Sequence, residues 1–205
     1  MYIPQQNKMK GNDEIVSFMK AYQFATIVTV KDNLPTATHL PFVITETENG
    51  VILSAHFAKA NPQWQQLLNN KVLVIFAEPH AYISPSHYDS EMNVPTWNYI
   101  SVHTYGTAAI ITGIDEGVGE LEKMINLFEQ PYMEQWKKFP GEMKLKLLQA
   151  IVPFNIIVQE IQAKEKLSQN KNKNERQRIV AALQKSGHSA EQEIATYMQK
   201  KEQDL

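Results

Sequence analysis

Histidine is the first residue type to consider for chemistry, because the histidines of this chain are unevenly distributed. Five of the six lie between residues 38 and 103, namely His39, His56, His80, His87 and His103. None of their spacings is the i, i+4 pair that places two ligands on one helix face, and no Asp or Glu cluster accompanies them. The sequence therefore does not predict a metal site, and each histidine is better interpreted as an ordinary hydrogen-bonding residue.

Motifs for covalent catalysis are absent from the sequence. The 205 residues include no cysteine, which excludes disulfides, thiolate catalysis and cysteine-ligated zinc. There is no Gly-x-Ser-x-Gly elbow of the hydrolase type. The glycine-rich loops of P-loop ATPases and dinucleotide-binding folds are also missing. No catalytic residue is assigned, and whether the chain is an enzyme is left open.

Residues 51–64 combine the features of a phosphate-binding site. An apolar, β-branched run predicts a strand, and Lys59 follows it. Asn61-Pro62 is typical of a helix start, since Asn caps the first turn and Pro there loses no helical hydrogen bond. The next apolar residues are spaced i, i+3, i+4, which predicts a helix with one buried face: Trp64, Leu67 and Leu68. A cation beside free helix-start amides would suit a phosphate.

Six predicted strands must position these residues. They cover 24–30, 36–45, 51–58, 72–77, 97–112 and 151–162, and Pro41 in the second indicates an edge, a bulge or the end of pairing. Helices are predicted over 12–22, 115–130, parts of 133–150, 174–186 and from 189 onward. Most connections are too short for crossover helices, so we expect an α+β protein with a small antiparallel β-barrel. Residues 78–95 are expected to be a long irregular loop.

Composition is ordinary for one globular core, with 43% hydrophobic and 20% charged residues. No apolar segment has the length of a membrane span, and the N-terminus lacks a secretory apolar region. Together with the missing cysteines, these features lead us to expect a cytoplasmic protein without a membrane contact.

A basic stretch at residues 164–178 stands out against the net charge of −2. Six cations oppose Glu165 and Glu175 there: Lys164, Lys166, Lys171, Lys173, Arg176 and Arg178. One interpretation is a solvated connector, and the others are an anion-binding edge or a DNA contact. The excess of about four charges is small for DNA binding, and no helix-turn-helix is evident.

An aromatic and polar run at residues 93–99 has two interpretations. In the first, Trp97 and Tyr99 share one strand face and fill the core, with Asn98 pointing outward. In the second, Trp97 borders a planar ligand that needs stacking and apolar cover.

Several segments carry a resemblance to a known family. They are residues 37–41 (ATHLP), 56–64 (HFAKANPQW), 80–84 (HAYIS), 94–99 (VPTWNY) and 166–170 (KLSQN). Together they resemble the PaiB family of FMN-binding split-barrel proteins, described as negative regulators of protease synthesis and sporulation. Two positions depart from that pattern: Asn33 replaces a common turn glycine, and His87 replaces a large aromatic residue. Asn tolerates positive φ, so the first departure should be harmless.

The resemblance implies a fold, a cofactor and an assembly. The fold is a six-stranded antiparallel split β-barrel of the pyridoxamine-phosphate-oxidase type, with flanking helices and a C-terminal helical tail. Residues 1–165 would form the FMN-binding domain, and residues 166–205 a basic connector and helical tail packed on the barrel. The protein would be a homodimer with FMN in a groove near the subunit interface.

The resemblance also implies roles for individual residues. Lys59, with the backbone of Ala60 and Asn61, would receive the FMN phosphate. The flavin ring would be lined by Thr38, His39 and Leu40, and the groove closed by Trp97 and Asn98. His56 is a further candidate, and Ser168 and Gln169 would approach from the rim of the barrel.

Three hypotheses about function follow from this resemblance. The first is an FMN-binding regulatory protein, with the 164–178 stretch as one route to DNA. The second is a small FMN-dependent oxidoreductase acting on an unidentified metabolite, in which the flavin supplies the redox chemistry. The third is an intact barrel that has lost its cofactor site and serves as a scaffold for a partner.

Overall fold

A computed structural model describes residues 1–68 and 70–203 of the chain. They fall into two compact units, each described here by itself. The sheet unit contains residues 16–76 and 103–161, and the terminal unit contains residues 1–15, 77–102 and 162–203. The predicted division into residues 1–165 and 166–205 stays a prediction, and residues 204–205 of that tail lie outside the described residues.

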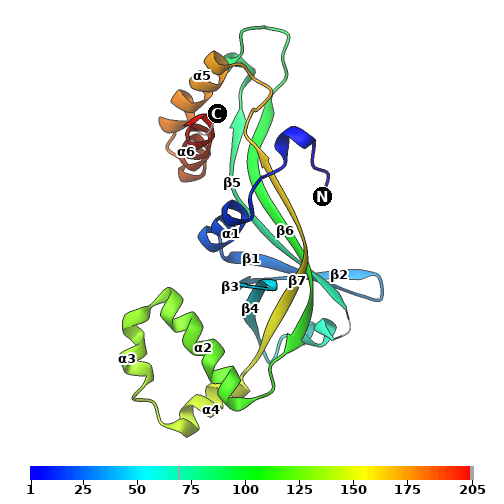
Figure 1. The fold of residues 1–205 in the computed structure, drawn as a ribbon, viewed down its shortest axis with the longest axis vertical. Coiled ribbons are helices and arrows are strands. Elements are labelled where there is room, and N and C mark those ends of the chain that lie inside the picture. Colours follow the sequence, from blue (N-terminus) through cyan, green and yellow to red (C-terminus); the bar gives the residue numbers. More distant parts are fainter. Residues whose placement is uncertain (69, 204–205) are drawn as a thin grey trace. The chain divides into compact units, whose positions relative to one another are not determined.

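Seven strands form one open antiparallel sheet in the order β2-β1-β5-β6-β7-β4-β3 (Figure 1). This confirms the α+β class with an antiparallel sheet, but the predicted count of six strands was wrong, and the seven strands form an open sheet. The strands are β1 (Phe24–Lys31), β2 (Leu34–Pro41), β3 (Val43–Thr47), β4 (Gly50–Ala58), β5 (Lys71–Ile83), β6 (Thr96–Ile110) and β7 (Ile151–Lys166).

The additional strand arises at Pro41. The sequence pattern predicted one strand over residues 36–45, whereas β2 ends at Pro41 and β3 begins at Val43. β2 pairs with β1 and β3 pairs with β4, so the chain changes partners at this point. Phe42 lies between the two strands and is fully buried. A proline without an N–H ends the ladder, and the buried aromatic ring anchors the transition.

The hairpin between β1 and β2 explains why Asn33 is acceptable in place of glycine. Asp32 and Asn33 have φ values of 51° and 62°, and the ladder closes at the pair Lys31 and Leu34. Two central residues with positive φ give the type I′ geometry that suits the twist of a hairpin. Asn and Asp adopt this region more readily than other non-glycine residues, so the expectation for Asn33 is confirmed.

The helix expected after Asn61 is a short 3₁₀ segment, η2 (Pro62–Leu67). With three residues per turn its apolar positions do not follow the predicted i, i+3, i+4 stripe. Leu67 is completely buried, whereas Leu68 is 52% exposed.

The expected irregular segment at 78–95 was also too long, because β5 continues to Ile83 and is followed by η3 (Pro85–His87).

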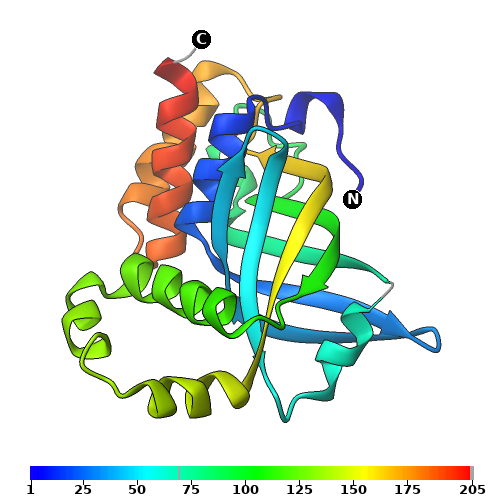
Figure 2. The ribbon, with the colours of Figure 1, turned by 60° about the horizontal axis from the view of Figure 1, so that its bottom comes forward.

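Helices fill the remaining connections. In the sheet unit α2 (Ile114–Phe128), η4 (Gln130–Tyr132), α3 (Met133–Trp136) and α4 (Gly141–Gln149) form one excursion between β6 and β7 (Figure 2). The terminal unit holds η1 (Gln5–Asn7), α5 (Lys173–Gln184) and α6 (Ser189–Gln203), and α1 (Asn12–Ala21) contributes residues to both units. Within residues 1–68 and 70–203, no helix is both long and apolar enough to span a membrane.

The core of the sheet unit is aromatic. Phe57 stacks on Phe154 with ring centroids 5.3 Å apart, and Phe42 meets Phe76 edge-on at 6.1 Å. All four rings are completely buried, and each contributes about 1.5–3 kcal/mol by leaving water. Gly106 allows β6 to lie close to β7, because a Cβ at this position would be 2.3 Å from the Ile157 carbonyl oxygen. This core supports the strands that carry the candidate site.

Candidate functional site

Gln63 is the centre of a buried polar cluster in the sheet unit. It is 1% exposed, and its Nε2 donates to the Thr36 carbonyl oxygen at 3.0 Å and to Thr29 Oγ1 at 3.1 Å. Its Oε1 accepts from Thr38 Oγ1 at 2.5 Å. A single side chain thus connects η2 to β1 and β2. We call Thr29, Thr38, Asn61 and Gln63 the Gln63 cluster.

The Gln63 cluster brings two predicted FMN-binding residues together. Asn61 Nδ2 donates to Thr38 Oγ1 at 3.1 Å, and Asn61 Oδ1 accepts from the Gln63 amide at 3.0 Å. The second bond confirms Asn61 as the cap of the segment that follows it. Gln63 itself was missed by the sequence analysis, since a glutamine at a helix start is normally exposed to solvent. Its burial follows from the 3₁₀ geometry, which no local pattern indicated.

Lys59 is exposed, and its Nζ lies 4.3 Å from the centre of the Trp64 ring. The backbone around it differs from the expected phosphate cradle. The Lys59 amide donates to the Ala150 carbonyl oxygen at 2.8 Å, and the Asn61 amide donates to the Ala58 carbonyl oxygen at 2.9 Å. Because the Gln63 amide also bonds to its cap Asn61, fewer helix-start amides are free than the sequence led us to expect. The exposed ammonium group of Lys59 is the positive charge that this turn offers to an anion.

A pocket of about 350 Å³ opens beside Lys59. Its wall is mostly apolar and is built by the end of β6, the start of β7 and two helices: Ile110–Ile114, Leu145, Leu148, Gln149 and Ile151–Pro153. Among the described residues, Lys59 is the one predicted cofactor residue that lines this pocket. A cation at the edge of an apolar hollow suits a ligand with one charged end and one apolar end.

The other predicted residues of the sheet unit differ in exposure. His39 is exposed and stacks on Phe24 with centroids 6.2 Å apart, Leu40 is half-buried, and Ala60 is exposed. His56 lies on β4 opposite Pro153 of β7. Burial lowers the pKa of His56, which favours the neutral form of its imidazole.

In the terminal unit, the Trp97 side chain points outward and the Asn98 side chain points inward, the reverse of the interpretation in which Trp97 fills the core. Trp97 is 52% exposed, and its ring lies 5.9 Å from His80 and 5.8 Å from Tyr82. Asn98 is completely buried. The interpretation that Trp97 fills the core with Asn98 outward was therefore wrong. The three rings form an exposed aromatic surface on β5 and β6, as a planar ligand or a partner would require.

Asn98, Ser168 and Gln169 are engaged inside the terminal unit. Ser168 donates to Asn98 Oδ1 at 3.1 Å, and Asn98 Nδ2 donates to the Met198 sulfur at 3.5 Å. Ser168 has a φ of 58°, and this buried bond helps to hold it there. Gln169 accepts from the Leu167 amide at 2.8 Å and donates to the Glu165 carbonyl oxygen at 2.6 Å. These contacts give the three side chains a structural role, and their contact with a flavin stays a prediction.

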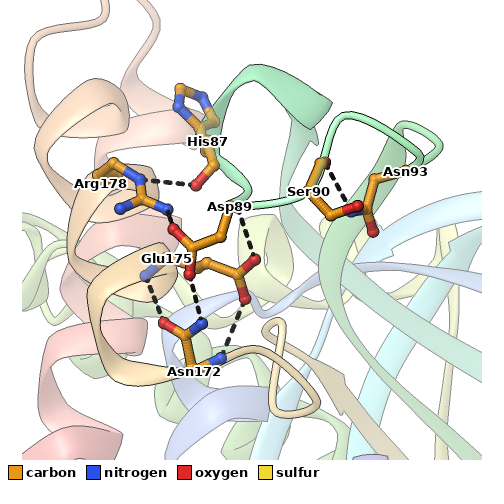
Figure 3. A network of polar contacts seen from close by, with 7 residues as sticks. All are labelled: His87, Asp89, Ser90, Asn93, Asn172, Glu175 and Arg178. Atoms are coloured by element: carbon orange, nitrogen blue, oxygen red, sulfur yellow. Dashed lines mark hydrogen bonds and ion pairs between the residues drawn. The ribbon is translucent and has the colours of Figure 1, made fainter.

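The basic stretch at 164–178 is used largely within the terminal unit. Arg178 donates to the His87 carbonyl oxygen at 2.8 Å and forms an ion pair with Asp89 (Figure 3). The Asn172 side chain donates to Asp89 at 2.8 Å, and Glu175 accepts from the Asp89 amide at 3.0 Å. We call Asp89, Asn172, Glu175 and Arg178 the Asp89 network. Through these hydrogen bonds and this ion pair, the loop after η3 is held against the start of α5.

Other cations of the stretch also have internal partners. Lys171 Nζ lies 3.5 Å from the centre of the Tyr88 ring and donates to Asn93 at 2.9 Å. Lys164 Nζ lies 5.0 Å from the centre of the Tyr99 ring, and Lys166 donates to Thr96. Burial lowers the pKa of Lys166. Most of the local positive charge is thus engaged in folding this unit.

Comparison with known proteins places the chain in a family. A family model described as "Putative FMN-binding domain" matches residues 1–160, more than three quarters of the chain. The chain belongs to this family. It is also 38% identical over 206 residues to "Protease synthase and sporulation protein PAI 2" of Bacillus subtilis, covering 98% of both chains. The resemblance to the PaiB family is therefore confirmed. A shorter match, 41% over 81 residues, is to "Uncharacterized protein YKL070W" of Saccharomyces cerevisiae, covering 37% of this chain and 48% of that protein.

Solved structures share the fold of this chain at low sequence identity. The flavocytochrome Anf3 of Azotobacter vinelandii has a TM-score of 0.65 and 13% identity, with 80% of this chain and 72% of that one covered. The FAD and heme binding protein of Mycobacterium smegmatis has a TM-score of 0.62 and 16% identity, with 78% and 73% covered. These likenesses describe the arrangement of the sheet and helices alone.

Proposed function

We propose that this protein binds FMN, and that the sheet unit supplies the phosphate end of the site. The observation that carries the proposal is the match of residues 1–160 to a family of FMN-binding domains. It is supported by the exposed cation Lys59, which lies two residues from Asn61 of the Gln63 cluster and lines an apolar pocket. These features suit a ligand with a charged phosphate and a flat apolar ring.

Each residue of the sheet unit has a proposed task. Lys59 contributes a point charge to the phosphate, and the hydroxyl and amide groups of Thr38 and Asn61 hold the neighbouring turn in place. His39, Leu40, His56 and Ala60 are proposed to flank the flavin, in keeping with their positions on β2, on β4 and in the turn after β4. When bound, FMN would supply one- or two-electron redox chemistry that this chain's side chains lack.

A regulatory role and a homodimer complete the proposal. The regulatory role is supported by the 38% identity to the sporulation protein PAI 2. A second copy would cover exposed apolar side chains at the edge of the sheet, where Phe24 is 68% and Leu34 is 69% exposed. We do not extend the proposal to DNA contact through residues 164–178, because the Asp89 network and the ring contacts use most of that charge.

The FMN proposal is tested by replacing the phosphate contact, Lys59→Ala. The wild type should bind FMN in a fluorescence-quenching titration. The variant should bind it about 10- to 100-fold more weakly, because a charge-assisted hydrogen bond contributes about 1.5–3 kcal/mol. Lys71→Ala is the matched control, as it removes an exposed cation elsewhere in the sheet unit.

Riboflavin separates the phosphate from the ring in the same assay. It lacks the phosphate, so its affinity should be the same for the wild type and Lys59→Ala. A wild type that fails to retain FMN would contradict the cofactor proposal. Equal FMN affinities for the two proteins would instead show that the phosphate binds elsewhere.

A further inference from the structure

Two adjoining pockets in the terminal unit form a strongly cationic hollow. The first, of about 330 Å³, is lined by four cations and one carboxylate: Lys8, Lys10, Arg176, Lys201 and Glu165, with Gln6, Leu167 and Gln169. The second, of about 460 Å³, is lined by Lys171, Lys173, Arg176, Glu202 and Gln169. Arg176 and Gln169 line both. The excess of positive charge is therefore concentrated around one arginine.

Arg176 is the unusual member of this hollow. Its side chain is only 9% exposed, yet neither Nε nor Nη2 has a hydrogen-bond partner among the described residues. Glu202 Oε1 lies 3.4 Å from Nε, close enough for an ion pair but without hydrogen-bond geometry. Two buried guanidinium donors without acceptors are costly, since removing an ion from water requires compensating hydrogen bonds. Among the described residues, Glu202 thus balances the charge of Arg176 but leaves Nε and Nη2 without a hydrogen-bond acceptor.

The two unpaired donors define the shape of that partner. Nε and Nη2 lie on the same edge of the guanidinium plane, the edge that makes two parallel hydrogen bonds to a carboxylate or a phosphate. Lys201 is already paired with Glu14 at 2.7 Å and Glu165 at 3.0 Å. Lys8 and Lys10 line the first pocket and are exposed, so their positive charges attract an anion over a longer range.

We propose that this hollow binds a small oxyanion, a metabolite carrying phosphate or carboxylate groups, with Arg176 as its central contact. Glu202 now occupies the place near Nε that the ligand's oxygen would take. A small molecule fits the volumes of the pockets, whereas the buried position of Arg176 is out of reach for the backbone of duplex DNA. The proposal does not depend on FMN binding and adds a second ligand to the protein.

The test is isothermal titration calorimetry of the full chain with inorganic phosphate and, separately, with citrate. Arg176→Ala should weaken binding at least about tenfold, and Arg176→Lys nearly as much, because lysine has no two-donor edge. Glu202→Gln should strengthen binding about threefold by removing the competing carboxylate. The stronger of the two probes distinguishes a phosphate ligand from a carboxylate ligand.

Two further variants keep the test decisive. Lys10→Ala alters an exposed side chain, so it should fold normally and weaken binding about threefold. Arg178→Ala removes the same charge from the same helix outside both pockets and should leave binding unchanged. The proposal is overturned if neither probe binds the wild type, or if Arg176→Ala and Arg178→Ala have equal effects. Displacement of phosphate by short duplex DNA would also overturn it in favour of a nucleic-acid site.

Discussion

The Gln63 cluster of the sheet unit and the Asp89 network of the terminal unit are two solutions to the same problem. Each connects a turn to a neighbouring element through side chains. The first uses a neutral amide that is 1% exposed, whereas the second uses charged groups, with the Asp89 and Arg178 side chains 58% and 43% exposed. A buried neutral cluster stabilises more per bond and is insensitive to pH and salt, while the exposed Asp89–Arg178 pair is screened.

This difference bears on function. The candidate phosphate residue Lys59 lies beside the rigid neutral cluster and keeps its charge available to a ligand. In the terminal unit most cations of the basic stretch are engaged in internal contacts, and Arg176 is a buried exception. Positive charge in this molecule therefore falls into three groups: Lys59 at the proposed phosphate site, the cations that hold the terminal unit together, and Arg176 in a cationic pocket.

The largest effect should come from removing the buried amide of the Gln63 cluster. Gln63→Ala removes the side-chain donor to the Thr36 carbonyl and the acceptor of the Thr38 hydroxyl proton, and each unmet buried group costs about 1–3 kcal/mol. We expect a loss of about 3 kcal/mol in the free energy of unfolding, measured by urea titration. Gln66→Ala is the control, because Gln66 is only half-buried and accepts one bond, from Thr29 at 2.7 Å. If both variants lost the same free energy of unfolding, burial of the side chain would not explain the stability that Gln63 contributes.

A smaller effect is expected when the Asp89 network loses its central carboxylate. Glu175 caps α5 by accepting from the Asn172 amide and also accepts from the Asp89 amide. Glu175→Ala should lower the free energy of unfolding by about 1.5 kcal/mol, within the range for caps. Glu175→Gln retains one acceptor oxygen and should lose about half as much. A loss as large as that of Gln63→Ala would contradict the comparison.

The smallest effect should be a pH dependence confined to the charged network. Hydrogen bonds from Asn172 and Arg178 lower the pKa of Asp89 in the folded protein. Its contribution is therefore present above the unfolded-state pKa of about 4 and is lost as the pH falls through the folded pKa. Asp89→Asn cannot ionise, so the difference in melting temperature between wild type and variant should shrink from pH 7 to pH 3. A constant difference would show that the ion pair contributes nothing.

The sequence by itself indicated much of the fold and the family. Apolar, β-branched runs located the strands, Asn61 marked a cap, and five separate segments carried the resemblance to the PaiB family. These features are local, since alternation, capping and turn residues act over a few positions. The same reasoning could have identified Arg176 as buried. It precedes Ile179, Val180 and Leu183 at i+3, i+4 and i+7, and so shares the buried face of α5.

Tertiary structure decided what these local patterns left open. Pro41 could have been an edge, a bulge or an end, and the change of partner from β1 to β4 made it an end. The burial of Gln63 depends on partners 27 and 34 residues away, and Trp97 lies beside rings of the neighbouring strand β5. The engagement of Arg178 with Asp89 crosses 89 positions of sequence. Burial and pairing are properties of distant contacts, so only the folded chain determines which charges are free to bind a ligand.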